Sequence, residues 1–306
     1  MRRPTFPNAG GPGSDAGVTP VTRRLLDWYR PRRRAYPWRE SADPYRVLVS
    51  EVMLQQTQAV RVAPAYARFV SKFPTIRDLA AAPRSQVIRA WAGLGHNRRA
   101  VALSETARAI VRDGGRVPSS IEQLVALPGV GPYTAAAVSA IAFGRPVPAI
   151  DTNVTRVVAR HRLGAEAAGV SAVRISREAE AWLDPTDPGA WNQAVMDLGR
   201  EVCRPRPRCD RCPLAAECRA FAIGITPRPK AEPRPRFEGS SRQVRGAIVR
   251  VLRGRPASTV AALEGCTGFD RARIGRALCE LHRDGVVAAG PAALAGRPRG
   301  RARLAE

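Results

Sequence analysis

Lysine is almost missing from this 306-residue chain, because only Lys72 and Lys230 are lysines among its 50 basic residues. Chemistry that needs an amine nucleophile is therefore restricted to two positions. The chain also lacks any apolar run of about 20 residues, which excludes a membrane-spanning helix. Residues 1–20 have no apolar core of the kind that signal peptides carry, so we expect a disordered tail and a cytoplasmic protein.

Strand-forming patterns are nearly absent too, which favours an all-α fold. Apolar residues recur with helical spacing over residues 21–224, where we expect two helical lobes. The first expected helix runs over about 44–57, and a second continues to about 73, where Pro64 conflicts with a helix interior. Further helices are expected over 75–82, 84–92, 97–113, 119–127, 132–143, 152–163, 170–183 and 187–202. The net charge of +24 suits a polyanionic partner, DNA or RNA before a membrane.

The C-terminal part of the chain has a different composition. Residues 225–240 are basic and rich in proline, as in a linker, and residues 291–306 resemble a second disordered tail. Residues 241–290 between them predict a small winged-helix-like unit, whose expected elements are helices over 241–253, about 257–265 and 270–283 and then the strand-like pair Val286 and Val287. The last of these helices carries arginines that suit either a DNA-facing or a solvated surface, namely Arg271, Arg273 and Arg276.

The segment LPGVGPY, residues 127–133, predicts two helices joined by a glycine hairpin. Ser119 and Glu122 are expected to form a capping box for the first helix, and Gly129 and Gly131 supply backbone freedom at the turn. Bare N–H groups at the start of the second helix can bind an anion such as phosphate. A tight turn without any ligand fits this short motif equally well.

Twenty residues after Gly131, Asp151 stands at the start of a further helix, where Asp is a favoured cap. The hairpin and this Asp together resemble the helix-hairpin-helix DNA glycosylases. The resemblance implies that Gly129 and Gly131 lie against DNA phosphate and that Asp151 serves catalysis. Relatives with lyase activity carry a Schiff-base lysine at the place of Tyr133, so we expect a monofunctional glycosylase.

Four of the six cysteines lie close together, as Cys203, Cys209, Cys212 and Cys218. A cytosolic chain favours metal over disulfides here, and a compact all-cysteine loop suits an iron–sulfur cluster better than zinc. The same glycosylases hold a [4Fe–4S] cluster in such a loop, although their first gap usually has six residues and here it has five. Arginines around the loop are expected to face DNA phosphate, namely Arg204, Arg206, Arg208 and Arg211.

The segment SEVMLQQTQ, residues 50–58, is the most specific motif for a substrate. Glu51 lies mid-helix among apolar residues, where an unpaired carboxylate is costly to bury. It is therefore exposed, or paired, or raised in pKa and used as an acid. The segment resembles, almost letter for letter, the motif of bacterial adenine DNA glycosylases, which remove adenine mispaired with 8-oxoguanine or guanine. The resemblance covers about residues 22–222.

This resemblance assigns roles to individual residues of the chain. It implies that the catalytic residues are Glu51, Asp151 and Asn153. It implies an adenine pocket that contains Trp38, Arg39, Tyr133 and Gln193. It also implies contacts to DNA or to the opposite base by Gln56, Thr57, Leu94, His96, Gly129 and Gly131.

The implied reaction needs two carboxylates with opposed protonation. A protonated Glu51 would donate to N7 of adenine and then assist the attacking water. An ionised Asp151 would stabilise the oxocarbenium-like sugar, with Asn153 orienting the pair. We therefore expect a monomeric enzyme of base excision repair, associated with the nucleoid, that hydrolyses the N-glycosidic bond of a base flipped out of double-stranded DNA.

Two departures from the family pattern matter. His96 stands where the family usually has a tyrosine, and because histidine titrates near neutrality we expect DNA binding to weaken from about pH 6 to 8. Residues 225–306 look unlike the β-rich C-terminal domain of the family, so the strength of the 8-oxoguanine preference stays open.

The rival interpretations are an endonuclease III-like glycosylase, a thymine-mismatch glycosylase and a non-catalytic basic DNA-binding protein.

Overall fold

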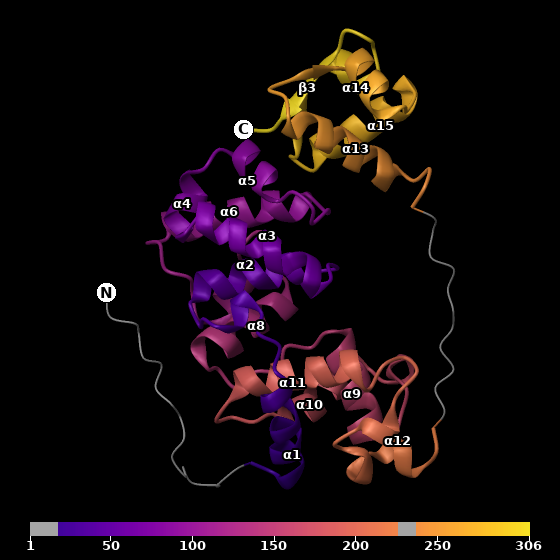
Figure 1. Cartoon of the computed structure of the whole chain (residues 1–306). Helices are drawn as coiled ribbons and strands as arrows, with labels where there is room; N and C mark the ends of the chain where they lie inside the picture. The colour runs from indigo at the N-terminus through magenta and orange to yellow at the C-terminus, as the bar shows by residue number, and fades with distance from the viewer. Residues whose placement is uncertain (1–17, 226–236) are drawn as a thin grey trace.

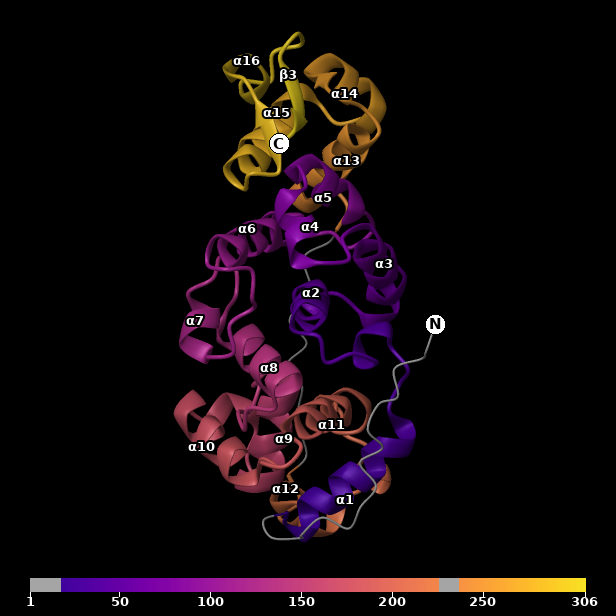
Figure 2. The ribbon, with the colours of Figure 1, turned by 90° about the vertical axis from the view of Figure 1, so that its left-hand side faces the viewer.

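The computed structural model describes residues 18–225 and 237–306 (Figure 1). The expected tail up to residue 17 and the linker residues 226–236 lie outside the described residues. Within the described ranges, no helix combines the length and the apolar character that crossing a membrane requires. Figure 2 shows two helical lobes and a C-terminal unit stacked along the length of the molecule.

The first lobe contains the helices between residues 44 and 143, which bury a common apolar core. They are α2 (Pro44–Leu54), α3 (Ala59–Lys72), α4 (Ile76–Ala81), α5 (Arg84–Ala90), α6 (Arg98–Arg112), α7 (Ile121–Val125) and α8 (Pro132–Phe143). α3 accommodates Pro64 in its interior. The missing N–H frees the carbonyl of Val60, a residue that is 62% exposed, so water can satisfy that group.

The second lobe combines the N-terminal helix with the helices that follow residue 151. They are α1 (Pro20–Tyr29), α9 (Thr152–Leu163), α10 (Ala172–Trp182), α11 (Pro188–Glu201) and α12 (Arg219–Ala222). Its core includes Trp182 and Trp191, whose rings meet edge to face at 5.5 Å. α8 packs against both α2 and α11, and it therefore joins the two lobes.

Two expected helix ends are wrong in detail. α2 ends at Leu54 and not near Thr57, because Gln55 leaves the helical region and Gln56 adopts a φ of +53°. Ser120 caps α7 by accepting from the N–H of Gln123 at 3.2 Å, so the expected box of Ser119 and Glu122 does not form.

The two hairpin glycines differ in what they require. Gly129 has a φ of +72°, and a Cβ there would stand 2.5 Å from the Cβ of Ala102. Both its conformation and its contact with α6 therefore demand glycine. Gly131 has a φ of −88° and open space around it, so the expected need for backbone freedom is not found there.

The C-terminal unit contains four helices and a small sheet. Its elements are α13 (Ser241–Arg253), β1 (Ser258–Thr259), α14 (Val260–Thr267), α15 (Arg271–Arg283), β2 (Val287–Ala289), α16 (Pro291–Leu294) and β3 (Arg301–Leu304). The strands are antiparallel in the order β1-β3-β2, with Ser258 opposite Ala302 and Ala288 opposite Arg303. The fold is thus mostly helical rather than all-α.

Residues 291–306 contain α16 and β3, so the expectation of a disordered C-terminal tail is wrong. Ala302 and Leu304 of β3 are buried in the core of the unit. Two of the arginines expected on α15 are engaged within the unit, since Arg271 pairs with Glu264 at 2.7 Å and Arg273 donates to the carbonyl of Gly239 at 2.7 Å. Their interactions favour the structural interpretation for these two side chains.

Candidate active site

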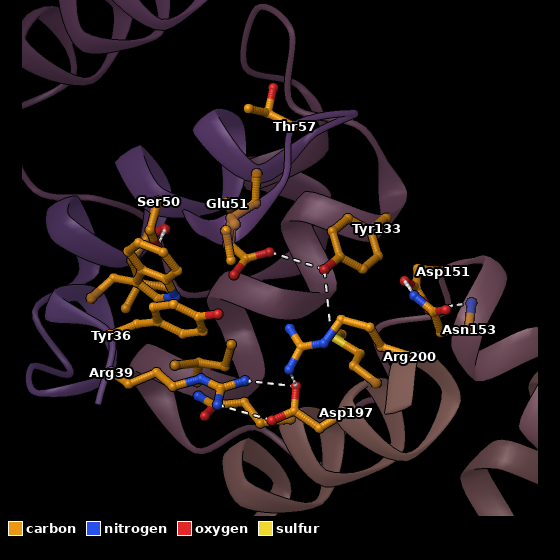
Figure 3. Close-up of a pocket in the computed structure, with 17 residues that line it drawn as sticks. Tyr36, Arg39, Ser50, Glu51, Thr57, Tyr133, Asp151, Asn153, Asp197 and Arg200 are labelled. Carbon is orange, nitrogen blue, oxygen red and sulfur yellow. Dashed lines mark hydrogen bonds and ion pairs between the residues drawn. The ribbon is translucent and has the colours of Figure 1, made fainter. Parts of the chain in front are cut away.

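Glu51 lies on α2 and is only 7% exposed, with its carboxylate facing a cavity between the lobes (Figure 3). The hydroxyl of Tyr133 donates to its Oε2 at 3.0 Å. Burial is the main cause that raises the pKa of Glu51 to about 7. The negative charge of Asp151 raises it further, and the hydrogen bond from Tyr133 lowers it. The carboxyl is therefore partly protonated at neutral pH, as an acid catalyst requires.

Asp151 reaches the same cavity from the start of α9. Its Oδ1 accepts from the backbone N–H groups of Asn153 and Val154 at 2.8 and 2.7 Å, and its Oδ2 accepts from the side-chain amide of Asn153 at 2.8 Å. A helix N-terminus favours negative charge. The structure therefore brings Glu51, Asp151 and Asn153 together in one cavity of about 220 Å³.

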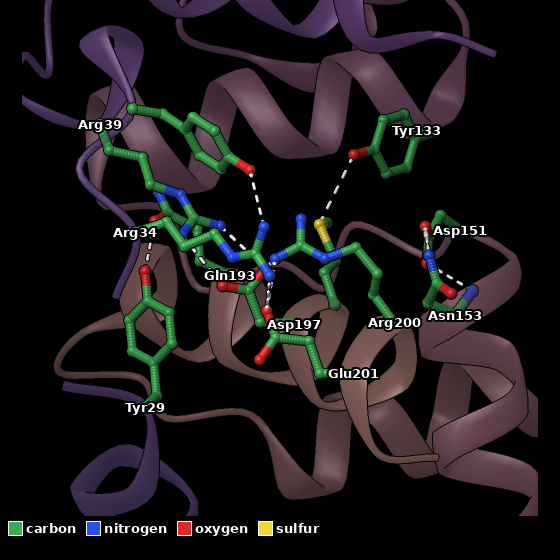
Figure 4. A network of polar contacts seen from close by, with 12 residues as sticks. Tyr29, Arg34, Arg39, Tyr133, Asp151, Asn153, Gln193, Asp197, Arg200 and Glu201 are labelled. Atoms are coloured by element: carbon green, nitrogen blue, oxygen red, sulfur yellow. Dashed lines mark hydrogen bonds and ion pairs between the residues drawn. The ribbon is translucent and has the colours of Figure 1, made fainter. Parts of the chain in front are cut away.

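The residues expected in the adenine pocket also line this cavity, namely Trp38, Arg39, Tyr133 and Gln193. Trp38 stacks on Tyr36 with ring centres 4.7 Å apart, which makes a flat apolar wall. The hydroxyl of Tyr29 donates to Oε1 of Gln193 at 2.6 Å and so fixes the orientation of its amide (Figure 4).

Sequence reasoning missed the group that holds Arg39. Asp197 of α11 pairs with both guanidinium nitrogens of Arg39, at 2.9 and 3.0 Å, and with Arg200 at 2.9 Å (Figure 4). Arg39 and Asp197 are both nearly buried, and such a bidentate pair fixes the guanidinium plane. The sequence did contain a signal, since Gln193, Asp197 and Arg200 follow at spacings of four and three on one helix face.

Arg156 is a second residue that sequence reasoning missed. Its guanidinium donates to Oδ1 of Asn153 at 2.8 Å and to the carbonyls of Gly199 and Cys203 at 2.7 and 2.6 Å. The amide that contacts Asp151 is thereby tied to the end of α11 and to the start of the cysteine loop. Backbone acceptors leave no pattern in a sequence, so nothing in the chain pointed to this arginine.

The expected DNA-contacting residues separate into three groups. Gln56, His96 and Gly129 line a groove of about 740 Å³ beside the C-terminal unit. Thr57 lines the cavity of Glu51 instead. Leu94 is 2% exposed and its side chain belongs to the core of the first lobe, so its expected contact to DNA could involve only its backbone.

Arg99 holds the turn that follows α2. It donates to the carbonyls of Val52 and Met53, both at 2.9 Å, and to Oγ1 of Thr57 at 2.9 Å. Burial lowers its pKa to about 10. This missed residue fixes the QQT turn against α6.

The surroundings of His96 disfavour its charged form in the free protein. Partial burial and the nearby Arg99, Arg242 and Arg245 lower the pKa of His96 below its usual value of 6.5. The expected weakening of DNA binding with rising pH stays a prediction, since bound phosphate would act in the opposite direction.

The four clustered cysteines are all free thiols and line one cavity of about 530 Å³. Arg160 borders it, with Nη1 3.7 Å from the sulfur of Cys203 and 2.6 Å from the carbonyl of Arg204. Among the described residues, no three metal-binding side chains converge closely enough to hold a single ion. The four thiols share one cavity, and thiolates are ligands for iron–sulfur clusters and for zinc.

Of the loop arginines, Arg206 and Arg208 line this cavity. Arg204 joins them around a smaller groove on the outside of the loop. Arg211 is exposed and lies 3.7 Å from Asp210. These side chains form a basic rim around the loop.

Comparison with known proteins places this chain in a DNA repair family. Residues 49–184 match the family described as HhH-GPD superfamily base excision DNA repair protein. The adenine DNA glycosylase of Mycolicibacterium smegmatis is 40% identical over 286 residues, which are 91% of this chain and 97% of that protein. Human adenine DNA glycosylase is 44% identical over 220 residues, which are 67% of this chain but 40% of the human protein.

Solved structures show the same fold. A thermostable thymine-DNA glycosylase gives a TM-score of 0.62 at 32% identity, covering 66% of this chain and 95% of that one. Endonuclease III in a non-covalent complex with DNA gives 0.57 at 23% identity, over 66% and 94% of the two chains, and supports the fold alone. Since the similarity to the mycobacterial enzyme extends over nearly its whole length, this chain belongs to the adenine DNA glycosylases of the helix-hairpin-helix superfamily.

Proposed function

We propose that the enzyme is a monofunctional glycosylase that hydrolyses the N-glycosidic bond of adenine paired with 8-oxoguanine or guanine in duplex DNA. The observation that carries the proposal is the pair of carboxylates in one cavity. Glu51 is buried with a pKa of about 7, and Asp151 is held by three N–H donors at a helix start.

In the proposed reaction, Glu51 donates its proton to N7 of the flipped adenine. The bond between C1′ and N9 then breaks, and its electron pair leaves with the base. Asp151 stabilises the positive charge that develops on the sugar. The Glu51 carboxylate takes a proton from the attacking water, whose oxygen bonds to C1′. Asn153 keeps Asp151 oriented, and the Asp197–Arg39 pair keeps one wall of the pocket rigid.

The monofunctional assignment rests on the residues that line the reacting centre in the described part of the chain, none of which carries an amine. Tyr133 occupies the hairpin position, and its hydroxyl is engaged with Glu51. Lys72 lies at the end of α3 beside Phe73 and does not line the cavity, and Lys230 lies outside the described residues. The described site therefore supports hydrolysis by water rather than a Schiff base with the abasic sugar.

We also propose a [4Fe–4S] cluster bound by Cys203, Cys209, Cys212 and Cys218. The shared cavity of the four thiols supports it, and so does the basic rim, which would hold the loop against DNA phosphate. Such a cluster would supply rigidity to this loop. We further propose that the protein acts as a monomer in the nucleoid, and that the C-terminal unit is winged-helix-like, with the strands that follow α15 as its wing.

The test is release of adenine from four matched duplexes that contain A·8-oxoguanine, A·G, A·T or T·G pairs. We expect strand cleavage after alkali for the first two duplexes only, with no borohydride-trapped adduct. Thymine release without adenine release, or efficient trapping at Lys72, would show that the proposal is wrong.

Metal analysis of anaerobically purified protein tests the cluster separately: about four irons are expected, and one zinc without iron would contradict it.

A further inference from the structure

The groove that contains His96 has a second wall made by the C-terminal unit. Gln56, His96 and Gly129 come from the first lobe, while Arg245, Arg283 and Gly285 come from α13 and from the end of α15. In Figures 1 and 2 the C-terminal unit sits directly above α5 and α6. Segments far apart in the sequence therefore meet next to the turn that follows the Glu51 helix.

The C-terminal unit is held firmly in this position. Ile88 of α5 and Val101 of α6 are buried within its apolar core. Arg253 donates to the carbonyl of Ile88 at 3.1 Å and to Oδ1 of Asn97 at 2.9 Å, and Arg89 donates back to the carbonyl of Arg253 at 3.1 Å. Because Asn97 follows His96 directly, the unit also fixes the loop that presents His96.

Backbone strain is concentrated at the same place. In the described ranges, the non-glycine residues with positive φ are Gln56, at +53°, and His96, at +44°. Both line this groove. Backbone of this kind is held in place by the surrounding structure and is common at functional sites.

The charge of the groove points to its ligand. Its two acidic residues are already paired, Asp284 with Arg245 and Glu105 with Arg84. Arg98 and Arg283, both exposed, have no ion pair or hydrogen bond with any residue that the structure describes. The groove therefore offers unpaired guanidinium groups to an anion, and guanidinium binds phosphate oxygens in a planar, bidentate manner.

We propose that this groove binds the sugar-phosphate backbone of the strand opposite the excised adenine, with Arg283 of the C-terminal unit and Arg98 of the first lobe contacting its phosphates. This inference rests on the proposed duplex substrate. The C-terminal unit is then part of the DNA-binding surface, beside Gln56 and His96, which are expected to contact the opposite base.

The test compares Arg283→Ala with Arg276→Ala in the full-length protein. Arg276 lies two turns earlier on α15, is exposed, and does not line the groove, so the two variants lose the same charge from the same helix. Binding is measured to a duplex with a non-cleavable abasic analogue opposite 8-oxoguanine, at several salt concentrations. We expect Arg283→Ala to weaken binding about fivefold and to reduce the salt slope by about one, with little change for Arg276→Ala.

Neutral methylphosphonate linkages identify the strand. Placed in the strand opposite the analogue, they should remove the difference between wild type and Arg283→Ala; placed in the adenine strand, they should leave it. Equal binding by the two alanine variants, or loss of the difference only with a neutral adenine strand, would overturn the inference. Since binding to the analogue needs no chemistry, absence of adenine release by the wild type would contradict the proposed function separately.

Discussion

The two walls of the active-site cavity place a carboxylate in opposite surroundings. On the first-lobe wall, Glu51 is buried among the apolar residues of α2 and receives one hydrogen bond, from Tyr133. On the second-lobe wall, Asp151 receives three N–H donors at the start of α9. Apolar burial favours a protonated carboxyl, and N–H donors favour the ionised form. If Glu51 is the acid and Asp151 the cation stabiliser, as we propose, the different surroundings of the two carboxylates suit these different roles.

Among the variants considered, Glu51→Gln should have the largest effect on the rate of adenine release. The substitution removes the donated proton but keeps the size of the side chain, so we expect the single-turnover rate of adenine release to fall by about 10²- to 10⁴-fold. Affinity for the A·8-oxoguanine duplex should remain close to that of the wild type. Near-normal single-turnover rates would mean that Glu51 is not the acid.

Asp151→Asn should have the next largest effect. The amide retains an acceptor for the helix N–H groups but loses the charge, so we expect a rate loss of about 10²- to 10³-fold. Stability should fall by about 1 kcal/mol, because the new amide nitrogen cannot accept from Asn153. The dependence of the rate on pH distinguishes the two variants. Asp151→Asn should keep a decline in rate with rising pH, which we assign to Glu51, but the decline should move below pH 7 because Asp151 no longer raises the pKa of Glu51. The residual rate of Glu51→Gln should show no such decline.

The burial of Glu51 should also appear in the stability of the protein. Its pKa is about 7 when folded, against 4.5 for the unperturbed group, so the folded state binds this proton more tightly. The resulting stability is present below about pH 4.5 and is lost as the pH rises through about 7. Above that pH, Glu51→Gln should be more stable than the wild type by up to about 3 kcal/mol, and the two should converge near pH 5.

Urea unfolding at pH 5 and pH 8 measures this difference. Glu122→Gln is the matched control, because Glu122 lies on the exposed surface of the first lobe. It should change stability little at either pH. A Glu51→Gln stability gain of equal size at both pH values would contradict the raised pKa.

The same contrast shows what a sequence reveals. Glu51 and Asp151 were assigned through the resemblance of their segments to known glycosylases, because the local patterns alone also fit a solvated carboxylate and a plain helix cap. Gly129 was predictable as part of a local turn. Asp197 and Arg39 are separated by 158 positions, and Arg99 and Arg156 donate mainly to backbone carbonyls. Such contacts depend on tertiary packing. The spacing of Gln193, Asp197 and Arg200 indicates a shared helix face, but it does not identify Arg39 as the partner of Asp197.

The prediction of a disordered C-terminal tail was wrong for a related reason. Residues 291–306 are rich in Gly, Pro and Arg, a composition that suggests disorder. Here glycine serves close packing instead, because a Cβ on Gly300 would lie 2.3 Å from the backbone nitrogen of Ala293. Strand β3 of four residues is too short to show a convincing alternation before its partners are known.

A methyl group added between α9 and α11 should test whether the position of Asp151 affects the surroundings of Glu51. A Cβ on Gly199 of α11 would stand 2.7 Å from the Cβ of Asn153 and 3.0 Å from its carbonyl oxygen. Gly199→Ala should therefore push the start of α9 away and shift Asn153 with Asp151. We expect a loss of about 1–3 kcal/mol in stability and a rate decrease of about tenfold, as the cation stabiliser moves from its productive position.

Gly246→Ala is the matched control, because Gly246 also lies inside a helix but has open space where a Cβ would be. There alanine should stabilise the protein by about 0.5–1 kcal/mol and leave the rate unchanged. Glu51 stands on the other wall, so Gly199→Ala should retain the decline in rate above about pH 7. A flattened pH profile would mean that the two walls are mechanically coupled and that the environment of Glu51 depends on the position of α9.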